Sequence, residues 1–286
     1  EGVSPIIKHL RFIQTLSNII TVAIENKRLF QESLRQEALK KEMELASKMQ
    51  SMLIPTSEKL PSHDFIRMKA FYHPHFEVGG DYYDVIQLSK NEVGFCIADV
   101  SGKGISAAIL MSNFQANLRA LYTPDQSLTD TLTRLNQSVM NSAKGEKFIT
   151  LFIATYHYKT RELTYVNAGH NPPLLYEPGS QKLSLLDSGC VGMGMLDELP
   201  FVNEGKLSLN EPAKLFCYTD GLVEVIQDSG IEFGTENLEK ELCNPDSLED
   251  NISTIIKNQK ILEGSAAIFD DISIIGAEFP GKNGFS

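Results

Sequence analysis

Residues 93–99 read VGFCIAD, and this stretch decides the fold because an apolar run leads directly into an aspartate. A run this apolar predicts a strand that is buried in the protein. The same arrangement recurs at residues 215–220, where LFCYT leads into Asp220, and it is reversed at residues 270–275, where two aspartates precede ISII. The chain therefore carries aspartates at the ends of several buried strands.

Two further aspartates lie beside a glycine pair. Residues 78–84 read VGGDYYD, so that Asp81 and Asp84 follow Gly79 and Gly80. Glycines also flank two of the strand-end aspartates, and they allow a backbone to approach an ion closely. A backbone carbonyl can then join the coordination sphere of a metal.

Aspartates that converge at one end of a sheet repel one another unless cations neutralise them. Hard divalent ions such as Mg²⁺ and Mn²⁺ take oxygen ligands. Two such ions about 3.5–4 Å apart can share a carboxylate, lower the pKa of a bridging water and clamp a phosphoryl group. The alternative for each aspartate taken singly is that it caps a turn, because Asp-Gly and Asp-Asp are common at strand ends. Spacing alone leaves both interpretations open.

The beginning of the chain has a different pattern. Residues 10–53 contain neither Gly nor Pro, and their apolar residues recur at alternating three- and four-residue steps, which predicts one long helix with a narrow seam. The seam shifts phase near residues 34–38, as in a coiled coil with a stutter, and Pro55 ends the helix. The helix either dimerises or packs on its own domain. We expect a signalling and linker helix at residues 1–54 and a globular domain at residues 55–286.

The globular part combines strands and helices. Short apolar segments between turn residues predict strands at residues 66–72, 83–88, 93–98, 148–158, 163–168, 174–177, 182–186, 215–218 and 272–277. Helical periodicity predicts helices at residues 105–121, 127–141 and 247–262, the last two opened by capping boxes at Ser127 and Ser247. This order predicts a layered α+β fold with strands in the middle and helices outside.

Composition argues against several classes of protein. The formal net charge of −11 disfavours non-specific binding to nucleic acid, which needs clustered Lys and Arg. No stretch approaches the roughly 18 uncharged apolar residues of a membrane span, and no secretory signal is visible, so we expect a cytoplasmic protein. The four cysteines show no paired zinc-ligand spacing, and we interpret them as reduced and structural.

Five motifs follow one another along the chain, namely VGGDYYD at 78–84, ADVSGKGISAA at 98–108, NAGHNPP at 167–173, YTDGLVE at 218–224 and FDDIS at 269–273. In this order they resemble the SpoIIE/RsbU branch of the type-2C (PPM) metal-dependent protein serine/threonine phosphatases. Residues 44–55, ELASKMQSMLIP, resemble the entry helix of that branch, so the resemblance covers about residues 45–278. It implies a four-layer α-β-β-α sandwich with two divalent ions, Mn²⁺ or Mg²⁺, at one edge.

The resemblance also implies roles for single residues. Asp99 matches the carboxylate that bridges both ions, while Asp81 and the backbone carbonyl of Val100 match ligands of one of them. Asp220 and one of the two aspartates at 270–271 match the ligands of the other ion. Within that doublet, Asp270 is the first choice and Asp271 the second.

Asp84 is expected to act through a water in the second shell of the site. A metal-activated water then attacks phosphoserine or phosphothreonine, so that no nucleophilic side chain is needed. Members of the branch act on phosphorylated anti-sigma-factor antagonists or related small regulatory domains. The expected substrate is therefore a phosphorylated regulatory protein of that type.

The N-terminal helix suggests how the activity is controlled. Residues 22–30, VAIENKRLF, resemble the closing helix of a GAF-type sensor domain. A linker helix that leads from a sensor into the catalytic domain suggests regulation through a homodimer, with the helices at 105–121 and 127–141 as switch elements that place Asp81. Two alternatives stay open, namely a non-catalytic signalling module with the same fold and another two-metal phosphohydrolase.

Overall fold

The computed structural model describes residues 5–226, 230–263 and 268–282. The chain divides into two units, Glu1–Lys48 and Met49–Ser286. Among the described residues, no helix has both the length and the apolar character needed to cross a membrane.

The first unit holds most of helix α1, which spans Pro5–Ser51. The absence of Gly and Pro over much of this stretch permits an uninterrupted helix. Its apolar seam is exposed, with Leu16, Ile20 and Phe30 each about half or more accessible to solvent. Ion pairs between side chains three or four residues apart, such as Lys41 with Glu37, decorate the helix surface. The long helix predicted from the sequence is therefore present.

The second unit is built on two sheets. In sheet A the order of strands is β1 (Ser62–His63), β2 (Ile66–His73), β12 (Ile272–Phe279), β11 (Ala213–Tyr218), β7 (Leu174–Glu177) and β8 (Lys182–Leu185), all antiparallel. In sheet B it is β10 (Gly205–Ser208), β6 (Glu162–Ala168), β5 (Ile149–His157), β4 (Glu92–Val100) and β3 (Tyr82–Ser89), with β9 (Gly189–Cys190) parallel to β6.

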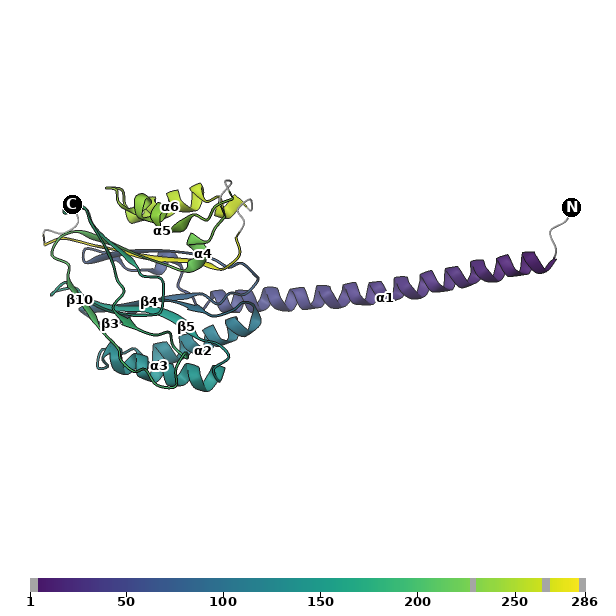
Figure 1. The fold of residues 1–286 in the computed structure, drawn as a ribbon, viewed down its shortest axis with the longest axis horizontal. Coiled ribbons are helices and arrows are strands. Elements are labelled where there is room, and N and C mark those ends of the chain that lie inside the picture. The colour runs from purple at the N-terminus through teal and green to yellow at the C-terminus, as the bar shows by residue number, and fades with distance from the viewer. Residues whose placement is uncertain (1–4, 227–229, 264–267, 283–286) are drawn as a thin grey trace. The chain divides into compact units, whose positions relative to one another are not determined.

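Helices form the two outer layers of this unit (Figure 1). Helices α2 (Ile105–Leu121) and α3 (Leu128–Ala143) cover one side, and α5 (Gly234–Leu242) and α6 (Leu248–Asn258) cover the other. The remaining helical pieces are the one-turn α4 (Asp220–Val223) and the 3₁₀ turns η1 (Ser57–Lys59) and η2 (Ile261–Glu263). The predicted four-layer α-β-β-α sandwich is confirmed.

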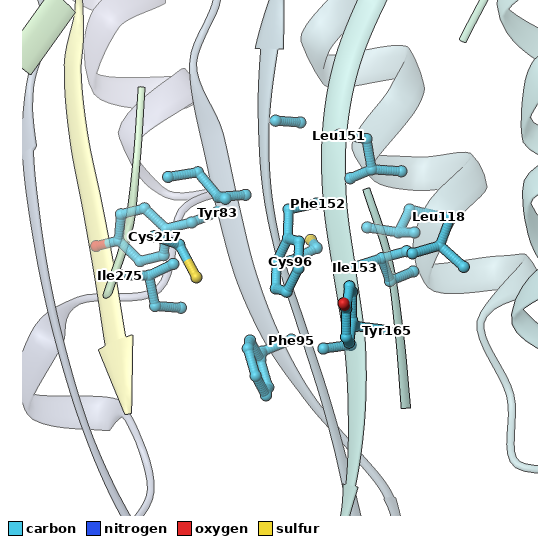
Figure 2. Close-up of a cluster of buried hydrophobic side chains, with 14 of the residues drawn as sticks. Tyr83, Phe95, Cys96, Leu118, Leu151, Phe152, Ile153, Tyr165, Cys217 and Ile275 are labelled. Carbon is cyan, nitrogen blue, oxygen red and sulfur yellow. The ribbon is translucent and has the colours of Figure 1, made fainter. Parts of the chain in front are cut away.

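The main core fills the space between the sheets and below α2 and α3. Figure 2 shows Cys217 and Ile275 from sheet A, Phe95 from sheet B and Leu118 from α2 within it. A second core joins α5 and α6 to the outer face of sheet A. Burying a side chain such as Phe95 contributes about 1.5–3 kcal/mol to folding. Together the two cores account for the near-continuous apolar runs that were read as buried strands.

The predicted elements differ from the structure mainly at one helix. The prediction of a helix over 247–262 is wrong at its C-terminal end, because α6 ends at Asn258 and Lys260 adopts a left-handed backbone with φ 53° before η2. Both capping boxes are confirmed, since the hydroxyls of Ser127 and Ser247 each accept a hydrogen bond from the backbone N–H three residues on. Neither β10 nor α5 was predicted from the sequence.

Candidate metal centre

The alternation of side chains along β4 determines which way Asp99 faces. Successive residues of a strand point to opposite faces of the sheet. Gly94 lies against the ring of Tyr122, which directly follows α2, so close that a Cβ on Gly94 would meet ring atoms. The even-numbered residues of β4 therefore face the helices. Asp99, an odd-numbered residue, faces sheet A.

Asp81 is tied to sheet A by a hydrogen-bond relay. It immediately precedes β3 and is only 2% exposed. Its Oδ2 accepts a hydrogen bond from the hydroxyl of Thr219 at 2.8 Å, and that hydroxyl oxygen accepts one from the backbone N–H of Ser273 at 2.9 Å. The end of β11 and the start of β12 thereby hold a carboxylate from the edge of sheet B.

The two aspartates before β12 have different partners. Asp271 accepts hydrogen bonds from the backbone N–H groups of His75, at 2.8 Å to Oδ1, and Gly80, at 2.6 Å to Oδ2. Asp270 forms an ion pair with Lys103, whose Nζ lies 2.8 Å from Oδ2 and also donates to the carbonyl of Phe269. Asp271 thus organises buried backbone. Asp270 accepts one hydrogen bond from the backbone N–H of Asp271, and its charged partner is a partly exposed lysine that another cation could replace.

Burial and mutual repulsion raise the pKa of these carboxyls. Burial, then the charges of Asp99 and Asp271, raise the pKa of Asp81 well above its ordinary value. Burial, then the charges of Asp220 and Asp270, raise the pKa of Asp99 to about 7. The pKa of Asp220 is also raised, first by burial and then by Asp270. Aspartates from both sheets therefore lie within electrostatic reach of one another.

Glycines allow the backbone to pack closely around this cluster. A Cβ on Gly80 would come within 3.0 Å of the Val100 carbonyl oxygen, so the two segments touch through backbone atoms. A Cβ on Gly221 would lie 2.1 Å from the carbonyl oxygen of Asp271, which leaves no room for any side chain there. The carbonyl of Val100 consequently lies beside the residue that precedes Asp81.

The donor chemistry fits a divalent cation. Over residues 5–226, 230–263 and 268–282, no group of three or more His, Cys, Asp or Glu side chains is already gathered as a cage for a metal ion. The donors are nevertheless all oxygens, as hard cations require. Burial first and the repulsion between neighbouring carboxylates second raise the pKa values of Asp81, Asp99 and Asp220, and a bound cation would relieve that repulsion. The residues that could hold such ions are Asp81, Asp99, Val100 through its carbonyl, Asp220 and Asp270.

Asp84 lies on the other face of β3 from Asp81. It is 0% exposed, and Arg119 of α2 binds both of its oxygens, at 2.7 Å through Nε and 2.8 Å through Nη2. The hydroxyl of Tyr82 donates to Oδ2 at 2.5 Å. These partners satisfy the carboxylate, and the predicted water-mediated role of Asp84 near an ion has no support from them.

Three residues of this region were missed from the sequence. Thr219 directly precedes Asp220 in the YTDG motif, so its position was visible although its hydroxyl partner was not. Arg119 lies in the predicted helix at 105–121 and could not be paired with Asp84 without coordinates. Gln50 belongs to the entry-helix segment, and its side chain contacts Gly79 in both directions.

Comparison with known proteins identifies the family. Residues 89–280 match the family described as Stage II sporulation protein E (SpoIIE), which is more than half of the chain. The fold is that of the type-2C-like phosphatase domains among the solved structures, and this chain belongs to the SpoIIE family.

Individual relatives agree with this assignment. The chain is 28% identical over 220 residues to the phosphoserine phosphatase RsbU of Bacillus subtilis, covering 76% of this chain and 64% of that protein. It is 29% identical over 189 residues to the phosphoserine phosphatase RsbP of the same species, covering 65% and 46%. The chain therefore spans less than two thirds of the length of these relatives.

Solved structures show the same fold. The SiaA-PP2C domain of Pseudomonas aeruginosa is similar with a TM-score of 0.70 at 19% identity, covering 85% of this chain and 98% of that one. The RsbU and RsbW domains of Rv1364c from Mycobacterium tuberculosis give a TM-score of 0.63 at 21% identity, covering 77% and 63%. A structure of RsbX, at 16% identity and a TM-score of 0.60, is described as a complex with magnesium.

Proposed function

We propose that this chain is a protein serine/threonine phosphatase that depends on two divalent cations, Mn²⁺ or Mg²⁺. The observation that carries the proposal is the meeting of buried and partly buried carboxylates from both sheets, where burial and neighbouring charges together raise the pKa of Asp81, Asp99 and Asp220. Such a cluster is unfavourable unless cations are bound. Asp81, Asp99, Asp220 and Asp270 are the proposed ligand side chains, and the carbonyl of Val100 is the proposed backbone ligand.

The residues of the chain have distinct tasks in this reaction. The ions, when bound, supply a water of lowered pKa and neutralise charge on the phosphoryl oxygens. Thr219 orients Asp81 through its hydroxyl, and the backbone N–H of Ser273 orients Thr219 in turn. Lys103 is partly exposed beside Asp270 and brings positive charge to the place where a phosphate monoester dianion enters. Asp271 fixes the loop at Gly80 rather than binding an ion.

The proposed substrate is a phosphorylated regulatory protein of the anti-sigma-factor antagonist type. The names of RsbU and RsbP, phosphoserine phosphatases, support hydrolysis of phosphoserine. A cytoplasmic location would accord with such a partner. The proposal extends to phosphothreonine, because phosphoserine and phosphothreonine are both alkyl phosphate monoesters that an activated water can attack in the same way.

Control by an N-terminal helix is a second part of the proposal. Residues 1–54 would form a signalling helix that follows a GAF-type sensor, and residues 55–286 the phosphatase domain. The exposed apolar side chains of α1, among them Ile13, Leu16 and Ile20, support dimerisation through a coiled coil. Sedimentation of the chain against a version that begins at Ser57 tests this, since a dimer should become a monomer.

Activity assays separate the proposed function from its alternatives. With Mn²⁺, the protein should hydrolyse p-nitrophenyl phosphate and a phosphoserine-bearing antagonist protein, and chelator or Asp220→Asn should abolish both activities. A non-catalytic module would show neither. Another two-metal phosphohydrolase would prefer cyclic or linear nucleotides to the phosphoprotein, and full activity of Asp220→Asn would remove Asp220 from the site.

A further inference from the structure

Gln50 makes a two-way contact with the glycine pair that precedes Asp81. It lies in the last turn of α1, within the unit that begins at Met49, and is only 7% exposed. Its Nε2 donates to the carbonyl oxygen of Gly79 at 2.7 Å, and its Oε1 accepts from the N–H of Gly79 at 3.0 Å. A primary amide has one donor and one acceptor side, so it pairs with the backbone of Gly79 as a neighbouring strand would.

The glycine pair has no side chains of its own and is held through its backbone. A Cβ on Gly79 would lie 2.5 Å from both Asp271 Oδ2 and the hydroxyl of Tyr72, so no side chain can anchor the segment at that point. Its position depends on backbone hydrogen bonds, from Gly79 to Gln50 on one side and from the N–H of Gly80 to Asp271 on the other. The side chains of Gln50 and Asp271, which are far apart in the sequence, therefore both hold this dipeptide.

These hydrogen bonds to Gly79 and Gly80 affect the surroundings of two of the proposed metal ligands. Asp81 follows Gly80 directly, so the path of the glycine pair sets the start of β3 and the reach of the Asp81 carboxylate. Gly80 also packs on the carbonyl of Val100. A shift of Gly79 would displace Asp81 directly and would change how Gly80 packs against the Val100 carbonyl, which the pairing of β4 with β5 holds in place. Asp220 and Asp270 belong to other segments of the chain.

We propose that Gln50 is a positioning residue for the metal centre, which holds Gly79 and Gly80 so that Asp81 and the Val100 carbonyl can bind a divalent cation. The proposal rests on the proposed function, because it presupposes the metal centre. It makes the final turn of α1 a part of the site. Outer-shell partners of this kind change metal affinity by about 10–100-fold when they are removed.

Calorimetric titration of the full chain with Mn²⁺ tests the proposal. Gln50→Met keeps the length of the side chain and its helix propensity but can neither donate nor accept a strong hydrogen bond. We expect the Kd for Mn²⁺ to rise at least about tenfold. The matched control is Gln36→Met, the same change at an exposed position of α1, which should leave the Kd unchanged.

Thermal unfolding distinguishes positioning from plain structural support. A structural role lowers the Tm equally with chelator and with Mn²⁺, whereas a positioning role shrinks the shift in Tm that Mn²⁺ produces. An unchanged Kd in folded Gln50→Met overturns the role of Gln50 alone. If the wild-type chain itself binds no Mn²⁺, the metal centre fails and this inference with it.

A second variant covers the case in which Gln50→Met does not fold. Gln50→Asn retains the polar amide but is one methylene shorter, so it cannot make both contacts with Gly79. Its Kd for Mn²⁺ should again rise about tenfold or more. An Asn variant with the affinity of the wild type would refute the proposal.

Discussion

Asp81 and Asp84, two buried aspartates three residues apart, face different parts of the protein and have different partners. Asp84 faces α2, where Arg119 and Tyr82 occupy both of its oxygens. Asp81 faces sheet A, where its hydrogen-bond donor is the neutral Thr219 and its charged neighbours are Asp99 and Asp271. The protein thus supplies its own cation to one carboxylate and leaves the other among like charges. This difference supports the proposal that Asp81 binds an external cation, and it is consistent with a structural role for Asp84.

The first prediction concerns Asp84 and its partner Arg119, where we expect the largest effect on stability. Arg119→Ala removes the counter-charge of a fully buried carboxylate, and leaving such a charge unpaired costs about 3–5 kcal/mol of folding free energy. Chemical denaturation in the presence of chelator measures this loss. Adding Asp84→Asn to Arg119→Ala should recover part of it, because a neutral amide needs no counter-ion. Simply additive losses in the double variant would contradict the pairing.

The second prediction concerns the aspartate cluster and the pH dependence of stability that Asp99 causes. The pKa of Asp99 is about 7 in the folded protein, above an ordinary value of 3.8. Between these values the folded state binds the proton more tightly, so the stability of the metal-free protein falls as pH rises. Relative to wild type, Asp99→Asn should therefore gain a few kcal/mol of unfolding free energy between about pH 4 and pH 7.

The comparison with Asp99→Asn removes an opposing effect. Burial lowers the pKa of His170 from 6.5 to about 4, so its contribution makes stability rise with pH over that interval. This contribution is common to both proteins and cancels in their difference. Denaturant titrations of the two proteins at a series of pH values, all with chelator, provide the measurement. A difference that does not vary with pH would show that Asp99 titrates normally.

The spacing of Asp81 and Asp84 could have placed them on opposite faces, although their roles were distinguished only through the family resemblance. Their spacing of three residues is odd, and an odd spacing in extended chain puts side chains on opposite faces. What alternation cannot supply is the partner on each face, because Arg119 and Thr219 are distant in sequence and reach these faces only through the fold.

Other features were predictable to the extent that they are local. The layers follow from apolar runs and helical periodicity, and the capping boxes at Ser127 and Ser247 are contained in four residues each. The short helix α5 was missed because its buried contribution rests on Leu238 and Leu242 alone, which is too little for a periodic pattern. The hydrogen bonds of Gln50 join residues far apart in the chain, which no local pattern reports.

The third prediction is that the same Asp→Asn change has opposite effects on stability at Asp81 and at Asp84 in the metal-free protein. With chelator, Asp81→Asn should be more stable than wild type, because burial and the charge of Asp99 oppose only an ionised side chain. With Mn²⁺ at one hundred times its Kd, wild type should gain about 2.7 kcal/mol, and Asp81→Asn should lose most of that gain. Asp84→Asn should be destabilised under both conditions. Thermal unfolding of the three proteins with and without Mn²⁺ gives the comparison, and equal Mn²⁺-induced shifts would deny Asp81 a ligand role.

The smallest effect is expected at Lys103, which is the cation beside the cluster. Its ion pair with Asp270 joins side chains that are 42% and 30% exposed, whereas the half-exposed Arg119 pairs with a carboxylate that is fully buried. Exposed pairs contribute about 0–1 kcal/mol, so Lys103→Gln should hardly change the stability of the metal-free protein. The same change frees Asp270 from a competing charge, and we therefore expect a modestly lower Kd for Mn²⁺. Calorimetric titration with Mn²⁺ checks this. A weakened affinity would mean that Lys103 helps to hold the site together. Lys103 would then be a structural cation like Arg119, and not one that a metal ion displaces.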